Sequence, residues 1–503
     1  MSAHLPRGWA LSTLDEIRFD QSSGVDPSKF PDECFELYSV PSFEVGRPEI
    51  VVGREIGSSK QTVLPGTVLL CKINPRINRA WIVDDYTDRN KIASTEWIPF
   101  FLIKGLEPKF LCHFLSRHQM RDFLASRASG VGGSLMRVKP STLEGYPIPI
   151  APLPEQHRIV AEIEKHFTRL DASVAALKRA RGNLKRYRAA VLKAACEGRL
   201  VPTEAELARA EGREYEPANV LLDRILRERR AKRGEPPAPD ASGLPELPEG
   251  WVWASLGQVF QVFVGATPSR ARSEYWNGDI PWVSSGEVSF CTIRDTRECI
   301  SDLGLRNSST ELHPPGTVLL GMIGEGKTRG QAAILAIAAC NNQNSAAIRV
   351  SEAGLPPGYI FRFLEGQYEQ TRQIGSGNNQ PALNKSRVQN IVFPLPPLAE
   401  QHRIVSEVER RLSLADELAT IVEHSLKRAD RLRQAILARA FEGRLVPQDP
   451  NDEPASVLLE RIRAERAAQA HPRNDRRARR APRKQRTRKT PDSPPARQTG
   501  AAA

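Results

Sequence analysis

The chain has 503 residues, enough for three or four structural units of about 100–200 residues each. Its longest uninterrupted apolar run, Ala332 to Cys340, has nine residues, whereas a membrane-spanning helix needs about 20, so a membrane span is excluded. The first residues also lack the apolar core of a signal peptide, and the seven scattered cysteines contain no C-x-x-C pair. We therefore expect a cytoplasmic protein with reduced thiols, without a disulfide framework or a zinc finger.

The net charge of +13 is unevenly distributed along the chain. Residues 471–503 hold eleven Lys or Arg and two Asp, whereas the preceding 470 residues hold 61 basic and 57 acidic side chains. A segment so poor in large apolar groups cannot form a core, so the sequence predicts a basic, disordered tail at 468–503. Such a tail is either simply solvated or attracts nucleic-acid phosphates without reading sequence.

Five short runs occur twice in the same order, which indicates an internal duplication. Each recurs after roughly 240–250 residues, too long a period for a solenoid repeat. A Pro/Gly-rich linker at 231–246 joins the two copies. The paired runs are Leu5–Trp9 with Leu247–Trp251, Pro65–Leu70 with Pro315–Leu320, Glu155–Val160 with Glu400–Val405, Glu197–Pro202 with Glu442–Pro447, and Glu216–Leu222 with Glu453–Leu459.

Each copy begins with a turn-rich domain, at 1–150 in the first copy and 247–395 in the second. Short runs rich in β-branched and aromatic residues alternate with Gly, Pro and Asn turns and predict strands. Helical periodicity also appears twice, so both domains are expected to be α+β. The predicted strands include Thr67–Leu70, Ala80–Val83 and Ala346–Val350, and the predicted helices are Lys109–Ala125 and Tyr359–Gln373.

Each copy ends with a long helix and a return segment, at 151–230 and 396–467. From Val160 to Val191, and again from Val405 to Ile436, mostly apolar residues recur in steps of three and four, which is typical of a coiled coil.

Gly198 and Gly443 are placed to end these helices in a left-handed conformation. We expect a long antiparallel two-helix coiled coil that separates the two domains, with pseudo-twofold symmetry. Twofold-related readers at a fixed separation are how dimeric proteins match two DNA half-sites.

Several runs resemble those of the specificity subunit of a type I restriction-modification system, over about residues 5–467. The resemblance implies a non-catalytic subunit whose two target-recognition domains each read half of a bipartite, asymmetric site in double-stranded DNA. The first domain lacks the motifs of the second, which suits unlike half-sites. The runs that carry the resemblance are 152–160, 397–405, Gly265–Ser269, Tyr275–Trp282, Gly375–Gln380 and the two Glu-Gly-Arg-Leu-Val-Pro closings.

The same resemblance implies partners and places the cofactors on them. Two methyltransferase subunits dock on the helices, and motor-nuclease restriction subunits add to the complex. S-adenosylmethionine and ATP with Mg²⁺ belong to those partners, and this chain is expected to hold no cofactor and no metal. The alternative is a coiled-coil scaffold of another DNA-associated assembly.

Residues Gly321–Thr328 match the G-x-x-x-x-G-K-[ST] pattern of a phosphate-binding loop. A nucleotide hydrolase also needs an acidic residue for Mg²⁺, and the sequence has no Asp from Leu303 to Ala415. We therefore interpret this run as a glycine-rich turn in a DNA-reading domain.

Candidate base-reading residues follow from groove chemistry, in which Arg and Lys suit guanine, Asn and Gln suit adenine, and Ser and Thr assist. Each could equally be a solvated turn residue or a phosphate contact. In the first domain the candidates are Lys72, Asn74, Arg76, Asn78 and Arg79. In the second they are Thr267, Ser269, Arg270, Arg272, Lys327, Arg329, Asn378, Asn379, Gln380 and Lys385.

Overall fold

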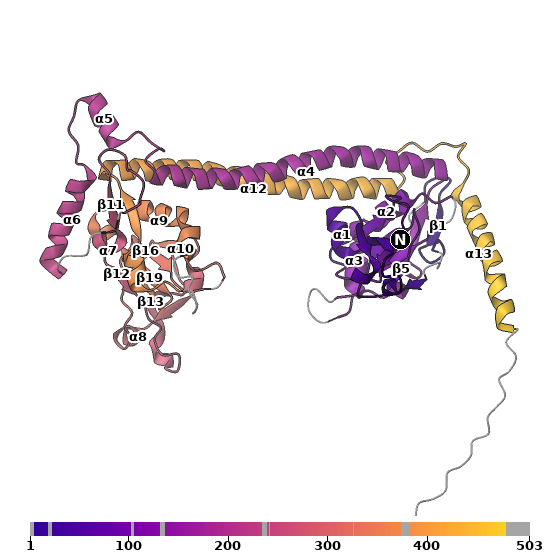
Figure 1. The fold of residues 1–503 in the computed structure, drawn as a ribbon, viewed down its shortest axis with the longest axis horizontal. Helices are drawn as coiled ribbons and strands as arrows, with labels where there is room; N and C mark the ends of the chain where they lie inside the picture. Colours follow the sequence, from indigo (N-terminus) through magenta and orange to yellow (C-terminus); the bar gives the residue numbers. More distant parts are fainter. Residues whose placement is uncertain are drawn as a thin grey trace, which may run out of the picture. The chain divides into compact units, whose positions relative to one another are not determined.

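The computed structural model describes residues 5–18, 23–101, 105–130, 136–233, 239–240, 242–324, 326–373 and 382–478. The chain folds into two compact units, and each draws on both copies of the duplication (Figure 1). Unit 1 comprises residues 1–174 and 427–503, and unit 2 comprises residues 175–426. We call the α+β domain of unit 1, up to Ile150, head 1, and that of unit 2, from Leu247 to Leu395, head 2.

Head 1 contains three small sheets. The first has the order β2-β5-β8-β3-β4, the second β7-β6-β9, and the third pairs β1 with β10, next to the start of the long helix α4. The strands are β1 Ala10–Thr13, β2 Gly24–Val25, β3 Cys34–Tyr38, β4 Glu49–Val52, β5 Lys60–Thr62, β6 Val68–Cys71, β7 Ala80–Ile82, β8 Lys91–Ser94, β9 Trp97–Phe100 and β10 Pro147–Ile150. The helices are α1 Val40–Val45, α2 Pro108–Leu115 and α3 His118–Arg127, with single 3-10 turns at Pro27–Lys29, Gly53–Glu55 and Pro140–Leu143.

Head 2 also contains three sheets, with the orders β12-β19-β16-β17-β14, β15-β13-β18 and β11-β20. Its strands are β11 Val252–Ser255, β12 Val262–Val264, β13 Trp276–Val283, β14 Cys291–Ile293, β15 Glu298–Ile300, β16 Thr317–Gly321, β17 Ala332–Leu335, β18 Cys340–Asn341, β19 Ser345–Arg349 and β20 Val392–Leu395. Its helices are α7 Leu256–Val259, α8 Asp302–Arg306, α9 Pro357–Gly366, α10 Tyr368–Gln373 and α11 Lys385–Gln389, with 3-10 turns at Ser273–Tyr275, Ser285–Glu287 and Ser351–Ala353.

The repeated Pro-Gly-Thr-Val-Leu-Leu run forms the same strand twice. It gives β6, in the three-stranded sheet of head 1, and β16, in the five-stranded sheet of head 2, and its valine and both leucines are buried in both heads. Each strand pairs antiparallel with the next, so that Val68 faces Ile82 and Val318 faces Ile334. The predicted α+β class is therefore confirmed, and the two heads share an architecture despite their divergent sequences.

Both segments predicted to be helical are helical, but each consists of two helices separated by a short break that was not predicted. In head 1 a break at Ser116 and Arg117 separates α2 from α3, and the side-chain amide of Asn78 donates to the Leu115 carbonyl there, at 2.7 Å. In head 2 the break falls at Gln367, directly after Gly366, a poor helix former. Local periodicity cannot show a break that a side chain from a distant loop stabilises.

The long helices are α4, Leu153–Cys196, and α12, Leu398–Phe441, and each continues from one unit into the other. Within unit 2, Arg181 of α4 pairs with Glu423 of α12 at 3.1 Å. Arg188, seven residues further along α4, pairs with Asp416, seven residues earlier in α12, so these segments run antiparallel.

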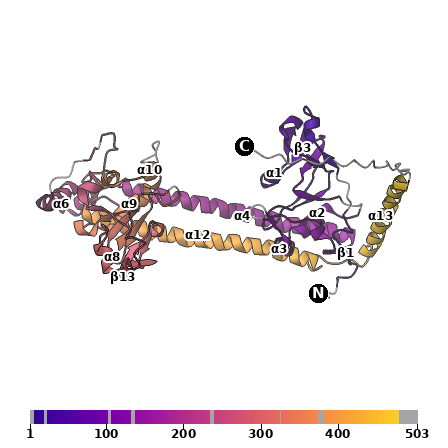
Figure 2. The same ribbon diagram turned by 90° about the horizontal axis from the view of Figure 1, so that it is seen from below.

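In unit 1, Asp171 of α4 pairs with Arg433 of α12. Figures 1 and 2 show the two helices side by side within each unit. The apolar residues that recur in steps of three and four along α12 are buried at Val408, Leu412 and Val422, among other positions. The predicted antiparallel pairing is confirmed for the segments inside each unit.

Three further helices complete the units: α5 Glu204–Glu211 and α6 Ala218–Arg233 in unit 2, and α13 Ala455–Ala478 in unit 1. Helix α13 extends past residue 467, where the basic tail was predicted to start. The composition there argues against a core, but a helix satisfies its own backbone hydrogen bonds, and Ala, Gln and Arg are good helix formers. The rest of the predicted tail, 479–503, lies outside the described residues.

None of the helices in the described part of the chain combines the length and hydropathy of a membrane span.

Candidate nucleic-acid interface and the junctions that support it

The five candidates of head 1 lie together in the loop between β6 and β7, residues 72–79. The backbone fixes this loop: Lys72 N–H donates to the Glu96 carbonyl at 2.9 Å, and Asn74 N–H donates to the Met136 carbonyl at 2.8 Å. Asn74 adopts a left-handed conformation with φ of 47°, which asparagine tolerates better than most residues.

Two of these five side chains have partners within head 1. Asn78 donates to the backbone at the break between α2 and α3, and the guanidinium of Arg79 lies 2.9 Å from the Glu44 carboxylate. Arg76 is exposed at the tip, and Lys72 and Asn74 are half-buried. The loop therefore presents a positively charged tip on a braced backbone, and base contacts by these residues stay a prediction.

In head 2, the candidates Thr267, Ser269, Arg270 and Arg272 lie in one loop that follows β12. This loop approaches Asn341 closely: a Cβ atom on Gly265 would lie 1.9 Å from the Asn341 carbonyl oxygen, so glycine is required there. Ala266 N–H donates to the same carbonyl at 3.0 Å. Thr267 donates to the side chain of Gln343 at 2.5 Å.

Arg270 is the most strongly oriented of these candidates. Its guanidinium makes two hydrogen bonds to the Glu298 carboxylate, at 2.5 and 2.9 Å, and stacks 3.7 Å from the ring centre of Trp276. The indole N–H of Trp276 in turn donates to the Ser269 carbonyl at 3.2 Å. A planar guanidinium held in this way presents its remaining N–H groups in a fixed direction, which suits bidentate recognition. Arg272 pairs with Glu274 at 3.2 Å.

The loop between β16 and β17 of head 2, residues 322–331, carries Lys327 and Arg329. The Lys327 side chain is exposed, and its carbonyl accepts a hydrogen bond from the Tyr368 hydroxyl at 2.7 Å. Arg329 is buried and donates to the Arg372 carbonyl at 3.0 Å. Arg329 therefore lies inside the head, where it connects the hairpin to α10.

The phosphate-loop pattern at Gly321–Thr328 has the geometry of a hairpin turn. Gly321 is the last residue of β16, and the chain returns antiparallel as β17, with Leu320 opposite Ala332. A phosphate-binding loop instead leads into a helix whose N-terminal N–H groups face the phosphates. The interpretation as a glycine-rich turn is confirmed.

The remaining candidates of head 2 are only partly described. Lys385 is exposed at the start of α11, with its ammonium 5.8 Å from the centre of the Phe263 ring. Asn378, Asn379 and Gln380 lie outside the described residues.

A buried network beneath the Gly265 loop has no sequence motif, and sequence reasoning missed it. Arg349 donates to Nδ1 of His313 at 3.2 Å, so the other ring nitrogen, Nε2, carries the proton and donates to the Asn341 side chain at 3.0 Å. Burial lowers the pKa of His313 to about 4, which keeps the ring neutral. Asn341 therefore has a fixed orientation, and its carbonyl holds the loop through Ala266.

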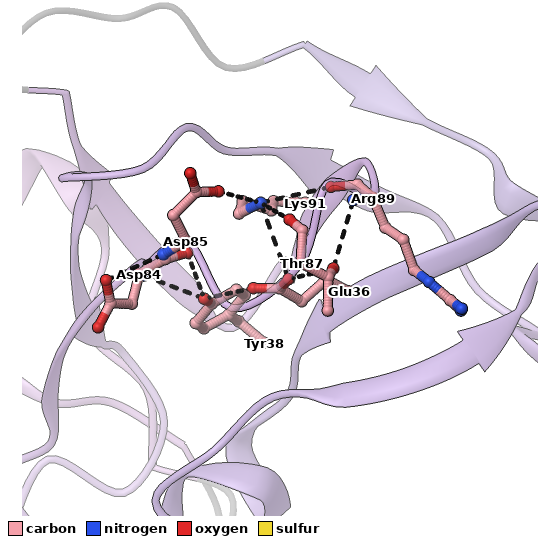
Figure 3. Close-up of polar contacts among 7 residues, drawn as sticks. All are labelled: Glu36, Tyr38, Asp84, Asp85, Thr87, Arg89 and Lys91. Atoms are coloured by element: carbon pink, nitrogen blue, oxygen red, sulfur yellow. Dashed lines mark hydrogen bonds and ion pairs between the residues drawn. The ribbon is translucent and has the colours of Figure 1, made fainter.

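A second buried network fixes a loop on head 1 (Figure 3). Glu36, fully buried in β3, accepts hydrogen bonds from the Tyr38 hydroxyl at 2.8 Å and from the Thr87 hydroxyl at 2.7 Å. Lys91 lies 2.8 Å from the Asp85 carboxylate and 3.8 Å from that of Glu36. Burial raises the pKa of Tyr38 well above its usual value, so it remains a donor.

The loop that this network holds is acidic. It carries Asp84, Asp85 and Asp88 between β7 and β8. Carboxylates repel DNA phosphates, so this part of head 1 is unsuited to a nucleic-acid backbone. Electrostatics therefore favours the positively charged tip of the β6–β7 loop over the Asp84–Asp88 loop as a contact point.

Four of the five repeated runs meet at a junction between head and helices, and the same junction forms once in each unit. In unit 1, Ala455 N–H donates to the Gly8 carbonyl at 2.8 Å. In unit 2, Ala218 N–H donates to the Gly250 carbonyl, also at 2.8 Å. The end of each copy thus packs on the head of the other copy. These repeats are structural, which explains why they match while the loops differ.

The Glu-Gln-His-Arg runs lie at these junctions. Gln156 and Gln401 donate to the backbone just before their helices, to Ala151 at 2.8 Å and to Pro396 at 2.9 Å. The following arginines bind the opposite copy. Arg158 lies 2.7 Å from Asp452, and Arg403 lies 2.5 Å from Glu204.

Glu400 is fully buried at the junction of unit 2, and its Oε2 accepts the backbone N–H of Glu204 at 2.9 Å. Burial raises the pKa of Glu400, and the Glu204 N–H, Trp251 and Arg403 only partly oppose this. A raised folded-state pKa means that the unfolded state ionises first as pH rises. The stability contributed by protonated Glu400 is therefore present at low pH and is lost as pH rises through the folded-state pKa.

We expect Glu400→Gln to stabilise unit 2 relative to wild type at neutral pH, because glutamine keeps the acceptor oxygen without a buried charge. This advantage should shrink as pH falls through the raised folded-state pKa of Glu400, and it should be absent below about 4.5, where the side chain is protonated in both the folded and the unfolded wild type. Urea unfolding at several pH values measures it, with Glu409→Gln on the same helix as the control. An advantage that does not depend on pH would contradict the assignment.

Three comparisons place the chain among known proteins. A family model described as the type I restriction modification DNA specificity domain matches residues 6–178 and 248–420. The EcoBI specificity subunit of a type I restriction enzyme from Escherichia coli is 26% identical over 377 residues, 70% of this chain and 71% of that protein. The EcoDI specificity subunit from Escherichia coli is 25% identical over 402 residues, 78% of this chain and 83% of that protein.

A solved chain has a similar fold. It comes from a study of complex assembly and conformational transition of the type I R-M system, and it superposes with a TM-score of 0.60 at 23% identity. The match covers 88% of this chain and 99% of that chain.

Proposed function

Because the chain belongs to the family of type I restriction-modification DNA specificity subunits, we propose that each of its two heads reads one half of a bipartite, asymmetric DNA site. A specificity subunit supplies recognition rather than catalysis. The observation that carries the proposal is the contrast between the heads: the shared strand and the junctions match, whereas the hairpin loops that follow this strand differ in length and in residues. Matching scaffolds with unlike loops suit two unlike half-sites.

The loops have the chemistry for this role. In head 2, Arg270 offers an oriented guanidinium for guanine, and Lys327 in the β16–β17 loop offers an exposed ammonium for guanine or phosphate. In head 1, Arg76 and Lys72 flank Asn74, whose side chain suits adenine. Both loops are braced by backbone hydrogen bonds, so little conformational entropy is lost when DNA binds.

We further propose that the chain acts in the cytoplasm with two methyltransferase subunits and motor-nuclease restriction subunits, which supply S-adenosylmethionine and ATP with Mg²⁺ chemistry. The duplication supports two copies of one partner, because each unit presents the same helices and the same junction. The alternative, a coiled-coil scaffold, gives no reason for braced polar loops on both heads.

Exchange of head 1 tests the proposal. Replacing residues 10–150 by the equivalent residues of a relative should change one half-site of the methylated sequence completely and leave the other unchanged. The measurement is methylome sequencing of cells that express the variant with its methyltransferase. As a control, exchange of residues 455–467, which belong to the junction, should leave both half-sites unchanged. If both half-sites changed with head 1, the heads would not be separate readers.

A further inference from the structure

Both heads expose an isoleucine in the hairpin loop that follows the shared strand. In head 1, Ile77 lies in the β6–β7 loop and is 48% exposed. In head 2, Ile323 lies in the β16–β17 loop and is 43% exposed. Single exposed apolar residues are common on protein surfaces. Here the exposure recurs at the same hairpin of two heads whose loops otherwise diverge, next to the cations proposed to meet DNA.

The loop of head 1 holds Ile77 in a fixed position. Its N–H donates to the Asn74 carbonyl at 3.0 Å, closing a tight turn. Pro75, two residues earlier, is buried, and Asn78, the next residue, is tied to the end of α2 by its side-chain amide. The residues around Ile77 are anchored on both sides, so its exposure is built into the turn.

The loop of head 2 achieves the same result with different residues. Met322, directly before Ile323, is buried, and its N–H donates to the Asn344 carbonyl at 2.8 Å. Its own carbonyl accepts the N–H of Leu383 at 3.0 Å. Beyond the turn, the Tyr368 hydroxyl holds the Lys327 backbone at 2.7 Å. Ile323 is therefore exposed on a loop tied to three other segments of the head.

An exposed isoleucine in a loop that also carries cations matches one feature of DNA in particular. The thymine C5-methyl group is the apolar group on the floor of the major groove, and proteins read it by apolar contact. A wedge between base pairs requires nearly the whole side chain to enter the stack. Both isoleucines are about half buried, which leaves roughly half of each side chain for contact at the groove floor.

We propose that Ile77 and Ile323 are specificity-determining residues that each contact the C5-methyl group of a thymine, Ile77 in one half-site and Ile323 in the other. This inference rests on the proposed function, in which each head reads one half-site. It assigns part of the reading to apolar side chains, in addition to the polar candidates of the same loops.

The test removes the methyl group from the DNA. The full chain, assembled with its methyltransferase subunits, is titrated with duplexes of its selected site in which each thymine in turn is replaced by deoxyuridine. We expect one position in each half-site at which this replacement weakens wild-type binding about fourfold, the effect of one lost methyl contact. Ile77→Ala should abolish the sensitivity in its half-site alone, and Ile323→Ala in the other alone.

Matched controls lie at the opposite ends of the same strands. Leu64, before β6, is 56% exposed, and Leu312, before β16, is 44% exposed. Leu64→Ala and Leu312→Ala should keep both methyl sensitivities. The inference is overturned if the isoleucine variants keep them too, if no thymine is sensitive, or if these variants lose subunit assembly instead. Sequence-specific binding without methyl sensitivity would remove this inference alone, whereas loss of half-site selection altogether would remove the proposed function.

Discussion

Replacing Gly198 by alanine is expected to destabilise unit 2 by about 2–4 kcal/mol. Gly198 follows α4 with φ of +66°, a left-handed conformation in which a Cβ atom is strained. That Cβ would also lie 2.4 Å from Cγ of Pro248 and 3.2 Å from the ring of Trp251. Both belong to the junction, so the substitution should disturb the contact between helix and head. Denaturant unfolding followed by tryptophan fluorescence measures the loss.

The same helix offers a matched control, a second glycine whose replacement by alanine should stabilise the protein instead of destabilising it. Gly182 lies in the middle of α4, and a Cβ added there would meet nothing within 4 Å. Gly182→Ala should therefore stabilise the helix by about 0.8–1 kcal/mol. In unit 1, Gly443→Ala should repeat the Gly198 effect, because its Cβ would lie 2.3 Å from Cγ of Pro6. If Gly198→Ala left the free energy of unfolding of unit 2 unchanged, the junction would have room for the added Cβ atom, which contradicts the close contact with Pro248.

Replacing Phe441 by alanine is expected to destabilise unit 1 by about 3–5 kcal/mol. Phe441 is buried at the end of α12, with its ring centre 4.9 Å from that of Phe110 and 5.2 Å from that of Phe114. Both partners lie on α2 of head 1. Truncation removes the aromatic contacts and leaves a cavity at the point where copy two packs on head 1.

Leu432→Ala is the control for this substitution, because Leu432 lies on the same helix and is 44% exposed. Its effect should stay within about 0.5 kcal/mol. Thermal unfolding of both variants separates the two outcomes. Equal, small effects would mean that α12 and head 1 do not share a core.

Periodicity and repeats allowed the long helices, their glycine ends and the shared strand to be predicted. These features are encoded locally: the spacing of apolar residues in α12, or a glycine directly after a helix such as Gly443, is visible without any partner. The helix breaks at Ser116 and Gln367 were not predicted, because the Ser116 break depends on Asn78, nearly forty residues away in the chain.

The candidate interface was predicted unevenly for a related reason. Residue type indicated the β6–β7 and β16–β17 loops, and the structure brings Lys72 to Arg79 together in one turn. Residue type could not separate Lys327, which is exposed, from Arg329, which is buried two positions later. Residue type also gave no signal for His313. The structural role of this buried histidine is visible only from its hydrogen bonds to Arg349 and Asn341, which only the folded chain brings close to it.

The end of each copy packs on the head of the other copy, and this arrangement affects the folding of the chain during its synthesis. Head 1 leaves the ribosome first, but Phe441 and α13, which cover it, come from the end of the chain. Residues 175–426 are synthesised in between, which takes roughly 10–50 s at about 5–20 residues per second. Throughout that interval the apolar surface around Phe110 and Phe114 lacks its cover. Nascent chains should therefore be most prone to aggregation, and most dependent on chaperones, before the second long helix emerges.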